Sequence, residues 1–317
     1  MTIAHHIREI GRGKDGARSL GQEQAYDLMS QVLDRSVSDL EIGAFAMAMR
    51  IKGESVPELV GFLQAAHERC IAIPARRPTV VLPSYNGARK LPNLTALLAL
   101  LLAQEGVDVL VHGCEHDAGR VTTAAIFHDL GLPVAVDVLE VEDAWARHEP
   151  VFVHTEALCP PLARLLDVRR VVGLRNSGHT IAKLLMPCQG PAALRVVNYT
   201  HPDYAALLQR FLAHIGAHAL LMRGTEGEPA ADPRRDPKLD VYIGGVFRAD
   251  LSRSAQEGVL TSLPLLPRSH DAATTAVYIQ SVVSGEKPAP PPLTRQVECI
   301  LLALGALSQP TSNERSA

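Results

Sequence analysis

The sequence TVVLPSYNGARKLPNLT, residues 79–95, passes from an apolar run through a polar loop to the start of an apolar helix. Residues 79–82 predict a buried strand, residues 84–90 the loop that follows it, and residues 94–104 a helix. Ligands bind at this kind of loop in open α/β sheets. Asn93 is placed to cap the helix, whose free N–H groups and dipole favour an anion. The stretch therefore predicts a phosphate-binding loop.

The loop carries neither of the common phosphate-binding motifs, because GxxxxGK[ST] and GxGxxG are both absent. It offers the polar side chains of Ser84 and Asn86, the backbone at Gly87, and the cations Arg89 and Lys90. The alternative is a surface turn with chance charges, since polar loops mark function only in part.

The charges of the chain are segregated along the sequence. With 317 residues, 47% of them hydrophobic, the chain can bury a large core in two domains, and its formal net charge of -3 argues on average against a nucleic-acid binder. Residues 69–104, however, hold five Lys or Arg and no acid, and residues 164–195 hold six against Asp167 alone. Residues 105–156 hold eleven acids. We expect a basic face on an acidic body.

The cysteines and the apolar stretches indicate a cytoplasmic protein. The five cysteines are odd in number and form no CxxC pair, which disfavours a disulfide framework and a zinc ribbon and fits a reducing compartment. The amino-terminal residues have no apolar signal core, and the longest apolar stretch, 94–103, is too short to span a bilayer. We expect no membrane association.

Two domains are expected. Residues 1–72 show helical periodicity and predict a small all-helical domain, which the helical return 158–187 completes. Strands and helices alternate over 73–157 and 188–317, which predicts a larger α/β domain with a mostly parallel sheet. Strands are expected within 107–113, 132–138, 150–154, 194–199 and 217–222. The polar segment 224–240 reads as a long functional or mobile loop.

This order of domains resembles glycosyltransferase family 3, the anthranilate phosphoribosyltransferase-like proteins. Residues 22–55, QEQAYDLMSQVLDRSVSDLEIGAFAMAMRIKGES, are similar to the helical domain of that family, and residues 79–95 occupy the place of its Gly-rich diphosphate loop. The resemblance implies a nucleoside phosphorylase/phosphoribosyltransferase-like fold and a homodimer formed through the helical domain.

The catalytic motifs of the family are altered in this chain. SYNGARK stands where the family has GTGGD, and residues 93–95 match its Asn-x-Ser-Thr segment. The family's Lys-His-Gly-Asn-Arg reads VHGCE at 111–115, which retains His112 and Gly113. The Asp-Glu pair that holds magnesium in the enzymes falls near residues 229–230. The acceptor-binding Arg falls near His179.

These changes weaken the expectation of transferase chemistry. A diphosphate leaving group needs a metal to neutralise its developing charge, and Glu115 in place of Arg would repel the substrate. The carboxylates Glu226, Glu228 and Asp232 either rebuild a magnesium site or form a solvated acidic turn. No metal or cofactor is therefore expected, with Mg²⁺ implied only if the chain is a transferase.

Several stretches are similar to the YbiB-type subfamily, the branch of this fold that binds DNA: PSYNGARK, VHG, GLRNSGHTIAKLL and MRGTEGEPAADPRR. That resemblance implies sequence-nonspecific binding of DNA or RNA, most simply single-stranded, with the phosphate backbone in a basic interdomain groove. The cations expected to line the groove are Arg89, Lys90, Arg120, Arg169, Arg170, Arg175, Lys183, Arg223, Arg234 and Arg235. For each of them the alternative is a surface salt bridge of little energetic value.

Two further hypotheses compete with nucleic-acid binding. One is a phosphoribosyl diphosphate-dependent phosphoribosyltransferase, and the other is a small-phosphate sensor without turnover. Both would use a phosphate or ligand pocket made by Ser84, Asn86, Gly87, Asn93, Thr95, His112 and His179. Tyr85 either stacks on a base or packs within the loop. Arg175, His179 and Lys183 are spaced four apart and would share one face of a helix.

Overall fold

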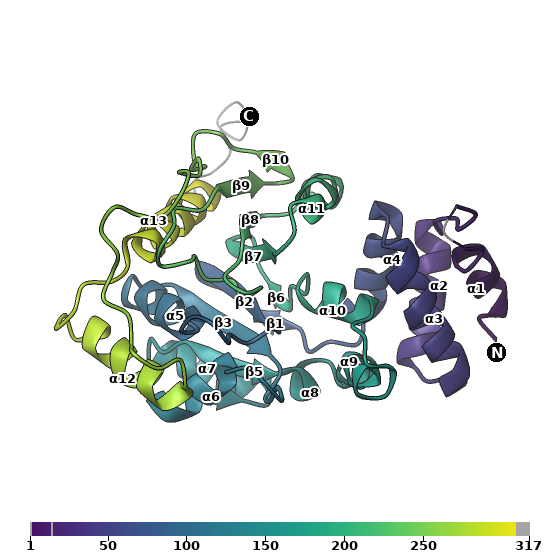
Figure 1. Cartoon of the computed structure of the whole chain (residues 1–317), viewed down its shortest axis with the longest axis horizontal. Helices are drawn as coiled ribbons and strands as arrows, with labels where there is room; N and C mark the ends of the chain where they lie inside the picture. Colours follow the sequence, from purple (N-terminus) through teal and green to yellow (C-terminus); the bar gives the residue numbers. More distant parts are fainter. Residues whose placement is uncertain (1, 14, 309–317) are drawn as a thin grey trace. The chain divides into compact units, whose positions relative to one another are not determined.

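The computed structural model describes residues 2–13 and 15–308 and divides into two compact units (Figure 1). Unit 1 comprises Met1–Ile71 and Thr155–Pro187, and unit 2 comprises Ala72–His154 and Cys188–Ala317. The chain passes between the units within a few residues of the expected bounds. Residues 309–317, expected in the α/β domain, lie outside the described residues.

Unit 1 is helical. Its helices are α1 (Ala4–Ile10), α2 (Gln22–Leu33), α3 (Asp39–Lys52), α4 (Val56–His67), α8 (Thr155–Leu158), α9 (Pro160–Val172) and α10 (Ser177–Ala182). Ser38 caps the N-terminus of α3. Its hydroxyl accepts from the Glu41 N–H, and the Glu41 carboxylate accepts from the Ser38 N–H. Helices α2 and α4 approach closely at Gly61, where a Cβ would lie 2.3 Å from the Gln22 carbonyl oxygen.

Unit 2 contains an eight-stranded sheet in the order β10-β9-β8-β7-β2-β3-β5-β4 (Figure 1). The strands are β2 (Thr79–Ser84), β3 (Asp108–Gly113), β4 (Val134–Ala135), β5 (Val151–His154), β7 (Ala193–Tyr199), β8 (Ala219–Arg223), β9 (Leu239–Ile243) and β10 (Val246–Phe247). A separate parallel pair joins β1 (Ile73–Pro74) to β6 (Cys188–Gln189). The ladders from β4 to β8 are parallel, and those of β9 and β10 are antiparallel. The expected fold class is confirmed.

The helices of unit 2 cover a sheet whose central strands are buried throughout. They are α5 (Thr95–Gln104), α6 (Thr123–Leu130), α7 (Val138–Ala146), α11 (Asp203–His214), α12 (Ala272–Val283) and α13 (Pro291–Leu307). Strands β2 and β3 are buried at every residue, which explains their unbroken apolar runs. Helix α12 packs against α5 and α6, and α13 packs against α5 and β9. Of the helices described, none is long and apolar enough to cross a membrane.

Three local expectations differ from the structure. Asn93 is not the N-cap of α5, because that position belongs to Leu94, although the Asn93 side chain accepts from the Thr95 N–H at 3.2 Å. The stretch 132–138 forms only the two-residue β4 before α7 begins at Val138. Strands β9 and β10 were not expected, because their short lengths and the flanking Gly244 and Gly245 gave no clear strand pattern.

Candidate anion site and cationic clusters

The loop after β2 folds into a cradle of hydrogen-bond donors. Gly87 takes a left-handed conformation with φ of 64°, and the Ala88 N–H donates to the Val121 carbonyl at 2.9 Å. Strand β3 runs so close to β2 that a Cβ on Gly113 would lie 1.8 Å from the Ser84 carbonyl oxygen. These constraints turn the backbone N–H groups of Asn86 and Gly87 toward one point.

That point is occupied by the side chain of Glu228. One carboxylate oxygen accepts from the N–H groups of Asn86 and Gly87, both at 2.7 Å. The other oxygen accepts from the Ser84 hydroxyl, and the Thr95 hydroxyl lies 3.4 Å from it. Glu228 is 1% exposed, and Ser84, Asn86 and Thr95 are buried as well. A carboxylate of the chain itself therefore takes the position where phosphate was expected.

A second carboxylate, that of Glu226, occupies the next part of the loop. One oxygen accepts from the N–H groups of Arg89, Lys90 and Leu91 at 3.2, 2.7 and 3.0 Å. The other lies 3.7 Å from the Arg120 guanidinium. Partial burial raises the pKa of Glu226, but the three N–H groups and Arg120 outweigh it and the net pKa is lowered. Glu226 also has a positive φ of 53°, which is uncommon for a side chain of this kind.

The segment that carries both glutamates is tied down at its base. The Thr225 hydroxyl donates to the Ala230 carbonyl at 2.8 Å, and the Glu228 N–H donates to the Thr225 carbonyl at 2.9 Å. Gln296 of α13, fully buried, donates to the Pro229 carbonyl at 2.7 Å and accepts from the Ala231 N–H at 2.8 Å. The expectation of a solvated acidic turn is wrong for Glu228.

The residues predicted for a phosphate pocket are only partly brought together. Ser84, Asn86, Gly87 and Thr95 line the cradle, and Asn93 supports it by donating to the Thr123 hydroxyl at 3.0 Å. His112 is buried in β3, where its Nδ1 and the Tyr85 hydroxyl are 2.8 Å apart. Tyr85 is 5% exposed and contacts His112, so of its two expected roles the packing one is confirmed and base stacking is not. His179 belongs to unit 1.

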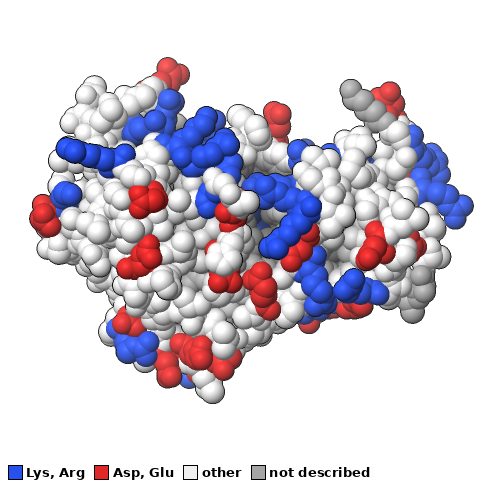
Figure 2. Space-filling view, turned by 60° about the horizontal axis from the view of Figure 1, so that its bottom comes forward, with Lys and Arg blue, Asp and Glu red and all other residues white. Residues whose placement is uncertain are grey.

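The predicted cations of unit 2 fall into two classes. Arg89, Lys90, Arg223 and Arg235 are exposed. Arg120 pairs with Glu226 and donates to the Gly87 carbonyl at 3.1 Å, whereas Arg234 holds Asp232 through two contacts at 3.0 Å. Figure 2 shows several groups of Lys and Arg side chains on one face of the molecule, with Asp and Glu among them. The exposed class is the one able to contact an external phosphate.

The predicted cations of unit 1 gather around His179. Burial lowers the pKa of His179 to about 3, and the positive charges of Arg175, Arg169 and Lys183 act in the same direction. The imidazole Nδ1 accepts from the Asn176 N–H at 3.3 Å. A shared helical face would require a helix from Arg175 to Lys183, but α10 spans only six residues: Arg175 precedes it and Lys183 caps its end.

Arg170 differs from its neighbours in unit 1. It is exposed and lies 3.0 Å from the carboxylate of Asp167, three residues earlier on α9. Such a pair on a helix surface contributes little to stability.

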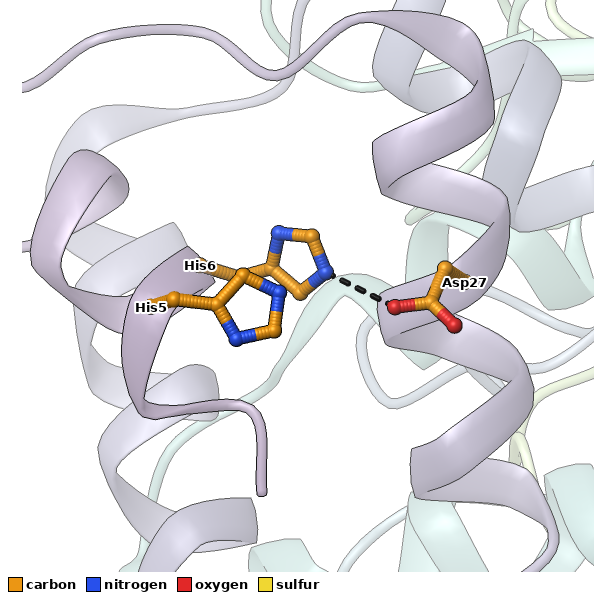
Figure 3. Close-up of side chains that lie close together, drawn as sticks. All are labelled: His5, His6 and Asp27. Carbon is orange, nitrogen blue, oxygen red and sulfur yellow. Dashed lines mark hydrogen bonds and ion pairs between the residues drawn. The ribbon is translucent and has the colours of Figure 1, made fainter. Parts of the chain in front are cut away.

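Among the described residues, one group of His and Asp side chains has the spacing of metal ligands: His5, His6 and Asp27 (Figure 3). His6 points at Asp27, with 2.9 Å between its Nε2 and the carboxylate, and His5 lies beside His6. The same carboxylate oxygen accepts from the Gln31 amide at 2.8 Å. Asp27 thus already serves two donors, and the contact joins α1 to α2.

Comparison with known proteins places this architecture in a family. Residues 4–70 match the helical bundle domain of a glycosyl transferase family. The chain is 40% identical over 308 residues to the uncharacterized protein YbiB of Escherichia coli K12, covering 96% of this chain and 95% of YbiB. It is 31% identical over 291 residues to the anthranilate phosphoribosyltransferase of Symbiobacterium thermophilum, covering 88% of this chain and 81% of that protein. The chain belongs to the anthranilate phosphoribosyltransferase-like family.

Solved structures of anthranilate phosphoribosyltransferase share this fold. The protein from Thermus thermophilus matches with a TM-score of 0.69 at 22% identity, covering 95% of this chain and 87% of that one. The Saccharomyces cerevisiae protein in complex with PRPP and Mg matches with a TM-score of 0.67 at 13% identity, covering 96% and 87%. At these low sequence identities, the two matches show a common fold for the anthranilate phosphoribosyltransferase-like family.

The magnesium that this family implies does not fit the carboxylates of this chain. The oxygens of Glu226 and Glu228 face N–H and O–H donors, whereas Mg²⁺ needs oxygen lone pairs directed at it in octahedral geometry. Asp232 is held by Arg234. The geometry therefore does not support the magnesium site suggested for these three residues.

Sequence reasoning identified the cradle but missed its occupant. Glu228 lies 144 positions from Ser84, and no local pattern connects the two. The one available signal was the motif GTEGEPAAD, in which two glutamates flank a glycine at the place of the family's acidic pair.

Proposed function

We propose that this chain binds nucleic acid through the phosphate backbone and without sequence preference. The observation that carries the proposal is that the carboxylate of Glu226 faces inward and fixes the backbone of two outward-facing cations on the loop after β2. Glu226 accepts from the N–H groups of Arg89 and Lys90, and this holds their backbone in place while both side chains remain exposed. A loop held in this way presents two adjacent cations at the carboxyl edge of the sheet. Contacts from such cations to the phosphate backbone do not depend on the base sequence.

The remaining cations support the same proposal. Arg223 and Arg235 add exposed charge to unit 2, and Arg169, Arg175 and Lys183 add a second group in unit 1. We treat each group as a separate phosphate-binding surface. Because Tyr85 is buried, base stacking contributes little, and the affinity for DNA or RNA depends mainly on charge.

Fluorescence anisotropy of a labelled random single-stranded oligonucleotide, titrated at several salt concentrations, tests the proposal. We expect log Kobs to fall against log salt with a slope of about -0.7 per phosphate contacted. Arg89→Glu/Lys90→Glu and Arg175→Glu/Lys183→Glu should each lower the affinity at low salt by roughly tenfold or more and make the slope shallower.

Arg76→Glu is the matched control for Lys90→Glu. Both replace an exposed cation in unit 2, but Arg76 precedes β2 and Lys90 follows it. The single variant Lys90→Glu should weaken oligonucleotide binding, whereas Arg76→Glu should leave it unchanged. Absence of binding at low salt, or an equal loss in both variants, would overturn the proposal.

The transferase alternative is less well supported, because Glu228 fills the cradle and Glu115 stands where the family has Arg. Release of diphosphate from phosphoribosyl diphosphate, in the presence of Mg²⁺ and an aromatic amine, would restore it. Thermal stabilisation by a nucleotide but not by an oligonucleotide would favour the phosphate-sensor alternative instead.

The proposal includes a homodimer formed through unit 1, in a cytoplasmic setting. Unit 1 exposes large apolar side chains at Leu40 (82%), Ile51 (66%) and Val171 (90%), which are candidates for such an interface. A dimer would carry each cationic surface twice and raise the affinity for long strands by avidity. Light scattering of the wild type and of Leu40→Glu/Ile51→Glu tests the dimer.

The free cysteines fit a reducing compartment.

A further inference from the structure

The cradle around Glu228 has the composition of an oxyanion site. Its donors are two successive backbone N–H groups, from Asn86 and Gly87, and the hydroxyls of Ser84 and Thr95. All are neutral, and they converge at the end of a strand beside the N-terminus of α5. Successive N–H groups turned to one side form the anion-binding concavities used for phosphate.

The position of Glu228 is unusual for a carboxylate whose role is only structural. A buried charge is costly unless it is paired and fully hydrogen-bonded. Here the compensation comes from groups that would serve a phosphate oxygen equally well. The space left beside the carboxylate, lined by Asn93, Thr225 and Ala230 among others, is too small for a water molecule.

We propose that Glu228 is a built-in ligand: its carboxylate occupies an oxyanion site that would otherwise accept phosphate or diphosphate, and thereby closes that site in this chain. Glu226 extends the same arrangement, because its carboxylate takes the N–H groups of Arg89, Lys90 and Leu91. Two anionic groups on one segment thus fill two neighbouring sets of donors. Two neighbouring sets of donors suit diphosphate, with its two linked phosphoryl groups, better than a single phosphate.

The segment is built to keep Glu228 in place. Gln296 fixes it on one side through Pro229 and Ala231, and Gly224 allows the close approach at its start, since a Cβ there would lie 2.3 Å from the Glu228 carbonyl oxygen. The left-handed backbone of Glu226 is a strained conformation that its three N–H contacts offset. The closure is therefore intramolecular, and the contacts of the segment hold the carboxylate in the site.

The test is diphosphate binding to the full chain, wild type against Glu228→Ala, by isothermal titration and thermal unfolding with inorganic diphosphate and inorganic phosphate as probes. Wild type should show no saturable binding at millimolar diphosphate. Glu228→Ala should bind it, with Tm raised by roughly 5 °C when diphosphate exceeds its Kd a hundredfold. In Glu228→Ala, where Glu226 still fills the second set of donors, inorganic phosphate and diphosphate should bind with similar affinity. In Glu226→Ala/Glu228→Ala, which frees both sets, diphosphate should bind more tightly than inorganic phosphate.

Three variants make the result specific. Adding Ser84→Ala to Glu228→Ala removes one donor and should weaken diphosphate binding by about tenfold or more. Glu115→Ala removes an exposed carboxylate of the same unit and should gain no binding. Glu228→Gln keeps the side-chain volume without its charge, so diphosphate should compete with it and bind more weakly than to Glu228→Ala. If Glu228→Ala fails to fold, Glu228→Gln decides the question.

Two results would overturn the inference. Wild type binding diphosphate as tightly as the folded variants would mean that Glu228 does not close the site. Folded Glu228 variants without any diphosphate binding would mean that the donors serve the carboxylate alone. Oligonucleotide binding plays no part in this test, so failure of the proposed function would leave the inference standing.

Discussion

Two buried glutamates, one in each unit, are compensated in different ways. Glu58 of unit 1 pairs with Lys52 at 2.7 Å and also accepts from the N–H groups of Leu20 and Ser55. Glu228 of unit 2 is held by neutral N–H and O–H donors in the cradle. Both side chains are almost fully buried. The charge of Glu58 is neutralised by the ammonium of Lys52, whereas the charge of Glu228 is stabilised by a set of neutral donors that suits an anion.

The difference in their partners indicates that Glu58 is a structural charge, whereas Glu228 takes the place of a ligand. Removing Glu58 leaves the ammonium of Lys52 without its carboxylate, a loss that belongs to the packing of the helices and not to a ligand site. Removing Glu228 leaves a vacant set of donors at a strand end, which an external oxyanion can fill. The contrast predicts that the two losses differ in whether phosphate compounds restore stability.

The largest expected effect is that of Glu58→Ala. Because it leaves the Lys52 ammonium, 8% exposed, without its carboxylate, we expect a loss of about 3–5 kcal/mol in the free energy of unfolding. Urea denaturation measures this loss. Diphosphate should not restore any of it; restoration would show that the Glu58 position also accepts an external anion. The exposed Glu23→Ala, on α2, is the control and should stay within about 0.5 kcal/mol of wild type.

A smaller effect is expected from Gln296→Leu, which removes the buried side chain that holds the segment carrying Glu228. The substitution leaves the Pro229 carbonyl and the Ala231 N–H without their buried partner, at a cost of about 2 kcal/mol. Hydrogen exchange of residues 225–231 should speed up relative to wild type. Gln280→Leu, at an exposed position of α12, should change neither quantity. Unchanged exchange in Gln296→Leu would show that the segment is held by its own turn.

The last effect is the smallest near neutral pH and grows only as the pH falls; it concerns His179, a half-buried base that its surroundings keep neutral. Its pKa in the folded state is about 3, below the ordinary value of 6.5, so the unfolded chain takes up the proton first. Stability should therefore fall as the pH drops from 6.5 toward 3, by up to about 1.4 kcal/mol per pH unit from this group. His179→Gln should remove that part of the slope in urea titrations at several pH values. The exposed His201→Gln is the control, and an equal change in both variants would contradict the assignment.

Most of the fold and the position of the loop follow from local patterns. Apolar residues at helical spacing predicted the helices of unit 1, and Leu28, Met29 and Val32 are indeed buried on one side of α2. The run from Thr79 predicted β2, since a strand buried on both faces has little choice of side chain. Each of these signals acts between neighbours in the chain, so it can be read without knowing the rest of the structure.

The contents of the cradle depended on contacts far apart in sequence. The pairing of Glu228 with Ser84, the burial of Tyr85 against His112 and the gathering of Arg169 and Lys183 around His179 are set by how strands and helices pack. A glutamate in a polar segment has the same local signature whether it is solvated, binds a metal or fills an anion site. Residues 79–95 by themselves predicted a phosphate-binding loop. The packing of β2, β3 and α13 placed a carboxylate there, because the buried N–H groups of the loop need an anionic partner and Glu228 is the nearest one.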